Sequence, residues 1–174
     1  MMMKMLDAAD LPLVTDAVRT ADEDNPKGYF EDERVKDLDK SEDRDWLRDC
    51  RGKVVKIISF LLLDLPEENF YKVIFMRRNL EEVIASQNKM LARRGEPADG
   101  SDDEKMTRLY AGHLRKVELM LSQRPNFEVL DVHYRQAVEN PREQAVRVGR
   151  FLGLQDRANE MTQAVDRALY RNRK

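Results

Sequence analysis

Short apolar runs alternate along the chain with longer segments that have helical spacing. Tyr71–Met76 has strand character, and a well-marked helix follows it directly. Asn79, with Glu82 three residues later, is typical of an N-cap and capping box. One face of this helix is marked by positions at helical spacing: Leu80, Val83, Ile84, Gln87 and Leu91. The pattern predicts a strand followed by a helix that packs back on a sheet.

The same pattern predicts the other elements. We expect further strands at Lys53–Phe60 and Phe127–His133, a short extended piece at Leu11–Val14 and a loop at residues 22–29. Helical segments are expected at 1–9, 31–40, 44–50, 80–94, 103–123, 141–152 and 156–168. Strands separated by long helical stretches favour parallel pairing through right-handed crossovers. The expected fold is therefore α/β, a three-layer sandwich with a short parallel sheet, in one domain spanning residues 1–174.

Charge is distributed unevenly along the chain. The net charge is −2, but residues 1–50 hold 15 acids and 8 bases, and the other 124 residues hold 18 acids and 23 bases. The first part is therefore net −7 and the rest net +5. Because no clustered basic stripe is present, the sequence argues against nucleic acid as a partner. It suits a modest basic pocket for one small anionic ligand.

The low cysteine content and the short apolar runs indicate the cellular compartment of the protein. The single cysteine, Cys50, excludes an internal disulfide framework and suggests a reducing compartment. No apolar run reaches 18 residues, so no transmembrane helix or other membrane attachment is expected. The first residues are interrupted too soon by a lysine for a signal peptide. We expect a cytoplasmic protein.

One arginine and one serine suggest a phosphate site. Arg78 follows a strand at the carboxyl end, where open α/β sheets collect ligands, and Ser86 lies eight positions later. A guanidinium fork and a hydroxyl match the oxygens of a phosphate. The alternative is a surface arginine and a helix serine with no joint task. Arg77 points to the other face of its strand and is expected to be a salt-bridge partner.

These residues, taken with others, resemble the sulfotransferase family, closest to its bacterial members. Arg78-Asn79 with Ser86 resembles the family's 3′-phosphate-binding segment. Further similar segments occur in order along the chain: Asn25-Pro-Lys-Gly-Tyr-Phe-Glu31, Phe127-Glu-Val-Leu-Asp-Val-His-Tyr134, Asn140-Pro-Arg142, Arg150-Phe-Leu-Gly153 and Leu169-Tyr-Arg-Asn-Arg173. The resemblance implies a P-loop NTPase-like fold. It also implies transfer of a sulfonate group from 3′-phosphoadenosine 5′-phosphosulfate (PAPS) to a hydroxyl or amine, with no metal.

One segment that family members contain has no counterpart in this sequence. Family members open with a strand and a loop resembling Pro-Arg-Ser-Gly-Thr-Ser, which wraps the 5′-phosphosulfate before a helix. Here Met1–Leu6 resembles that helix, and no such strand or loop precedes it. We therefore expect either a coding start placed at an internal methionine or a truncated product. The fold would then lack its first strand.

The resemblance assigns roles to five further residues. Lys56 would stabilise the transferring sulfonate, although a strand-edge lysine that extends to water is an equal alternative. Glu31 is a candidate base. Tyr134 would lie near the adenine, or else close a core. Arg171 and Arg173 would fold back onto the 3′-phosphate, or else belong to a solvated tail.

Two histidines remain to be interpreted. Asp131 and His133 share one face of the third expected strand, where the carboxylate could orient the imidazole as a base, or both could be a polar strand terminus. His113 lies on a charged helix and is expected to be structural.

The acceptor is not identified by the sequence, beyond a small molecule or a carbohydrate. A different class of function is a non-catalytic remnant that binds nucleotide weakly or self-associates through an exposed sheet edge. A P-loop kinase is disfavoured because no Gly-Lys-Ser/Thr loop occurs.

Overall fold

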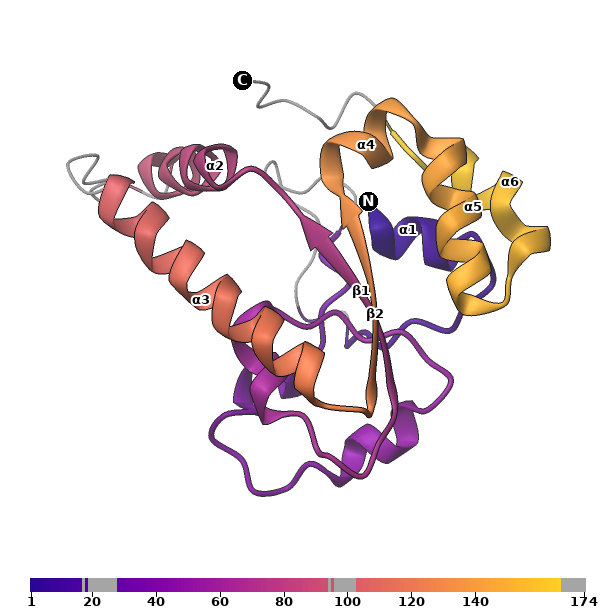
Figure 1. Ribbon diagram of the computed structural model, residues 1–174, viewed down its shortest axis with the longest axis horizontal. Coiled ribbons are helices and arrows are strands. Elements are labelled where there is room, and N and C mark those ends of the chain that lie inside the picture. The colour runs from indigo at the N-terminus through magenta and orange to yellow at the C-terminus, as the bar shows by residue number, and fades with distance from the viewer. Residues whose placement is uncertain (17, 19–27, 94, 96–102, 167–174) are drawn as a thin grey trace.

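The fold is α/β and is built on a short parallel sheet (Figure 1). The computed structural model describes residues 1–16, 18, 28–93, 95 and 103–166. In this part of the chain the sheet has two strands, β1 (Tyr71–Arg77) and β2 (Phe127–His133). They pair in parallel register, from Tyr71 with Phe127 to Arg77 with His133. The two strands are the expected ones, and the crossover between them consists mainly of helices.

Helices cover both faces of the sheet (Figure 1). Beside one face lie α2 (Leu80–Arg93), α3 (Asp103–Gln123) and the 3₁₀ helices η1 (Glu33–Asp37), η2 (Asp45–Cys50) and η3 (Ser59–Asp64). The other face carries α1 (Met2–Asp7), α4 (Tyr134–Glu139), α5 (Pro141–Leu152), η5 (Gln155–Arg157) and α6 (Ala158–Gln163). The expected three layers are therefore present.

Each face of the sheet has its own hydrophobic core, because alternate strand residues point in opposite directions. Phe75 and Phe127 enter the core shared with α3 and the 3₁₀ helices, where Val117 is fully buried. Val132 enters the other core, in which Met5 of α1 and Met161 of α6 have no exposed surface. The ends of β1 and β2 thus lie between two packed layers. This packing fixes the positions of the residues that follow the strands.

Local sequence signals fix the ends of two helices. The Asn79 side chain accepts hydrogen bonds from the backbone N–H groups of Glu81 and Glu82, at 2.8 and 3.4 Å, so Asn79 caps α2 as expected. Pro141 begins α5, and Gly153 ends it with a φ of +77°, a conformation that glycine adopts without strain.

The expected strand at Lys53–Phe60 is wrong. Only Val54 pairs, through an isolated parallel bridge to Leu13, and the chain enters η3 at Ser59. Its β-branched residues favour extended backbone, but a strand also needs a continuous neighbour for its N–H and C=O groups. Among the described residues this segment has such a neighbour only at the bridge.

Other differences concern helix type and length. The helical segments expected at 31–40 and 44–50 are short 3₁₀ helices, and the last helix ends at Gln163. Most of the expected loop at 22–29 lies outside the described residues. None of the helices in the described part of the chain is long and apolar enough to cross a membrane.

Candidate active site

Arg78 and Tyr134 meet where the two strands end. Each follows its strand directly, and the register that pairs Arg77 with His133 places their successors side by side. The guanidinium carbon of Arg78 lies 4.9 Å from the centre of the Tyr134 ring, a cation–π contact. Burial raises the pKa of the Tyr134 hydroxyl, and the positive charge of Arg78 partly offsets that rise. The structure therefore brings together two residues that the family resemblance places near the nucleotide.

A buried acid, Glu82, lies beside this pair. Its side chain is 8% exposed, and its Oε2 lies 3.5 Å from Arg78 Nε. Sequence reasoning gave Glu82 only a capping task, although its position four residues after Arg78 is a signal for an ion pair. The local charge is therefore less positive than Arg78 alone would make it.

Ser86 belongs to the same side of α2. It lies one helical turn beyond Glu82 on the same face of α2, and Arg78, which precedes the helix, contacts Glu82 from the N-terminal end. Ser86 is half-buried. No direct hydrogen bond joins Ser86 to Arg78 among the described residues, so a ligand that uses both would have to bridge them.

Arg77 is a structural ion-pair partner, as the sequence indicated. Its guanidinium binds Asp131 at 2.7 Å and Glu118 of α3 at 2.6 Å. Asp131 is thus bound to Arg77 rather than oriented toward His133, which is exposed and precedes α4 as its N-cap. The arrangement gives no support to an Asp131–His133 base.

The two residues expected to be catalytic contact each other. Lys56 Nζ lies 2.7 Å from Glu31 Oε1 and donates a second hydrogen bond, of 3.0 Å, to the backbone carbonyl of Tyr29. Their side chains are 37% and 23% exposed, respectively. The ammonium is therefore held in place and partly accessible, rather than extended freely into water. Lys56 belongs to a segment without regular secondary structure, outside the sheet.

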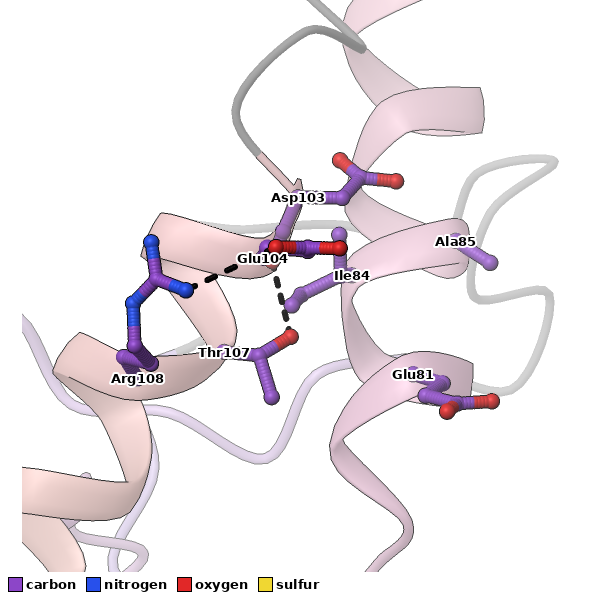
Figure 2. A pocket seen from close by; sticks show the side chains of 7 residues that line it. All are labelled: Glu81, Ile84, Ala85, Asp103, Glu104, Thr107 and Arg108. Carbon is purple, nitrogen blue, oxygen red and sulfur yellow. Dashed lines mark hydrogen bonds and ion pairs between the residues drawn. The ribbon is translucent and has the colours of Figure 1, made fainter.

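A hollow of about 430 Å³ lies between α2 and the start of α3 (Figure 2). It is lined by Glu81, Ile84, Ala85, Asp103, Glu104, Thr107 and Arg108. Three carboxylates outnumber one guanidinium, which itself lies 3.5 Å from Glu104. This lining disfavours an anionic ligand, and none of the residues with an expected role is part of it.

Arg171 and Arg173, which were expected to contact the 3′-phosphate, lie outside the described residues.

Comparison with known proteins identifies the family. None of the curated proteins and none of the solved structures matches the chain. A family model described as the sulfotransferase family matches residues 27–158, which is more than half of the chain. The matched range contains the Lys56–Glu31 pair, β1, β2 and the Arg78–Tyr134 pair. The chain therefore belongs to the sulfotransferase family.

Proposed function

We propose that this protein transfers a sulfonate group from PAPS to a hydroxyl or amine of a small-molecule or carbohydrate acceptor. The observation that carries the proposal is the contact of Arg78 with Tyr134 at the carboxyl ends of two parallel strands, in a chain of this family. That edge of a parallel sheet is where α/β proteins bind nucleotides.

The reaction needs charge stabilisation more than covalent participation. The acceptor oxygen or nitrogen forms a bond to sulfur, and the bond from sulfur to the bridging phosphate oxygen breaks. Adenosine 3′,5′-bisphosphate (PAP) leaves with that electron pair, and the acceptor proton passes to a base. A fixed cation near the sulfonate oxygens favours this transition state.

The residues can be assigned on this basis. Arg78, just before α2, and Ser86, within it, would bind the 3′-phosphate, and the Tyr134 ring would stack near the adenine. Lys56 would stabilise the sulfonate, with Glu31 holding its ammonium in place. Glu31 as a base would first have to leave the lysine. Arg171 and Arg173 remain predicted contributors to the 3′-phosphate site.

A non-catalytic function is the second candidate. Glu82 lies 3.5 Å from Arg78 Nε and makes the nucleotide end less positive than Arg78 alone would, which favours weak nucleotide binding. Weak nucleotide binding or self-association through a sheet edge would then be the activity of this chain.

The buried thiol of Cys50 is not part of a disulfide, which fits a reducing compartment. On that ground we propose that the protein is cytoplasmic.

The test is PAP binding measured by calorimetry. Arg78→Ala removes a charge-assisted phosphate contact and should weaken binding about 10- to 150-fold. Arg115→Ala is the matched control, because Arg115 is an exposed arginine on α3, and it should leave affinity unchanged. Equal affinity in wild type and Arg78→Ala, or no PAP binding by the wild type, would remove the proposal.

A further inference from the structure

A serine and a histidine outside the assigned site form a hydrogen-bonded pair. Ser59 Oγ lies 3.0 Å from His113 Nε2, joining the start of η3 to the middle of α3. The two residues are 54 positions apart, and the contact depends on the packing of η3 against α3. Ser59 follows Lys56 by three residues. Its Cα therefore lies at most about 10 Å from the Cα of the proposed sulfonate-stabilising lysine.

An aromatic ring lies directly on this pair. The Phe60 ring stacks on the His113 ring at 3.6 Å with an interplanar angle of 5°, and the Tyr110 ring meets Phe60 edge-on at 6.3 Å. Phe60 nevertheless remains 51% exposed. Ile58, next to Ser59, and Leu109, one turn before His113, are each 59% exposed. A hydrogen-bonding pair is thus bordered by aromatic and aliphatic surface open to solvent.

The pair is suited to a neutral hydroxyl. Burial, and to a smaller extent the charge of Lys116, lowers the pKa of His113, so the imidazole is neutral at neutral pH. A neutral imidazole and a serine hydroxyl can both donate and accept hydrogen bonds, as an alcohol or phenol does. The exposed half of the Phe60 ring supplies apolar surface beside the pair, on which the body of such a ligand can lie.

We propose that Ser59, His113 and Phe60 bind the acceptor, and that the acceptor is a hydroxyl on an aromatic or apolar body. The hydroxyl hydrogen-bonds to the Ser59–His113 pair while the body lies on Phe60. The role as acceptor site rests on the proposed sulfotransferase function, whereas the binding itself does not.

The experiment is an NMR titration of the full chain with 2-naphthol and, in parallel, with 2-methoxynaphthalene, which has no hydroxyl to donate. Phe60→Ala should weaken both ligands at least fivefold. Ser59→Ala should weaken 2-naphthol about three- to tenfold and leave the methyl ether unchanged. Phe70→Ala is the matched control, because Phe70 is 88% exposed, and it should change neither affinity.

The outcomes separate the two proposals. Imidazole signals of His113 should shift on addition of 2-naphthol, which a structural role alone would not produce. No binding of 2-naphthol by the wild type, or equal effects of Phe60→Ala and Phe70→Ala, would overturn the inference. Because no nucleotide is present, naphthol binding without PAP binding would keep the hydroxyl site and remove only its part in sulfonate transfer.

Discussion

Replacing Glu82 with glutamine should strengthen PAP binding. The carboxylate lies 3.5 Å from Arg78 Nε, on the guanidinium that the 3′-phosphate would also contact. It is only 8% exposed, so solvent screens it weakly. Glutamine has nearly the same shape and leaves no cavity, so the change isolates the charge. In the wild type the Glu82 carboxylate therefore repels the bound 3′-phosphate, and Glu82→Gln removes this repulsion.

The size of the effect follows from the geometry. A phosphate on the far side of the guanidinium would lie about 8 Å from the carboxylate, where two unit charges interact by about 2 kcal/mol at an effective dielectric constant of about 20. Removing one charge should lower the Kd of PAP about 30-fold. The Arg78 contact that is lost is small, since 3.5 Å is at the long limit of a hydrogen bond.

Calorimetry of PAP binding at low and at physiological salt would measure this gain. Glu81→Gln is the control, because Glu81 is exposed, adjacent in sequence and on a different side of α2. It should change the Kd less than threefold. Adding Arg78→Ala to Glu82→Gln should weaken binding relative to Glu82→Gln alone, because the charge-assisted contact with the phosphate is lost. A weaker affinity for Glu82→Gln, or equal gains for both glutamine variants, would refute the placement of the phosphate at Arg78.

Three further predictions concern stability. Gly149→Ala should lower the free energy of unfolding by about 1–3 kcal/mol, measured by urea denaturation, because its Cβ would lie 2.8 Å from the backbone oxygen of Leu154; an unchanged midpoint would contradict the close approach of α5 to that loop. Met5→Ala empties a fully buried position and should cost about 2–5 kcal/mol, seen as a fall in Tm of at least about 4 °C. Hydrogen bonding to Arg34 lowers the pKa of Asp32 below its ordinary 3.8, so this stabilisation is present above about pH 4 and is lost as pH falls through the lower folded-state pKa. Asp32→Asn should therefore cost about 1 kcal/mol at pH 7 and less at pH 3, and equal costs at both pH values would argue against the pairing.

Continuous elements were predictable from the sequence. β1, β2, α2, α3 and α5 carry complete periodic patterns, and caps such as Asn79 and Pro141 mark where helices begin. The segment after Lys53 was wrongly predicted to be a strand. An apolar run shows a preference for extended backbone but does not show whether a neighbouring strand is present to pair with it. The short helix α4 was also missed, since the residues from Tyr134 to Glu139 are too few to show a period.

The site was predictable in its parts and not in its pairings. Arg78 could be assigned to the ligand-binding edge of the sheet because it follows a strand. The expected place of Tyr134 near the adenine came from the family resemblance. The contact of Lys56 with Glu31 joins segments 25 residues apart, and that of Ser59 with His113 joins segments 54 apart. Such pairs depend on how η3 and the loops pack, and local sequence contains no signal for that.

The parallel pairing of β1 with β2 has a consequence for how the chain folds. Lys72 and Glu128, which form an ion pair across the two strands, are 56 positions apart, so the intervening chain must close a long loop before the strands meet. Both hydrophobic layers are completed only on that joined pair. We therefore expect slow, cooperative folding, with the rate set by one long-range encounter rather than by the helices, which can form early.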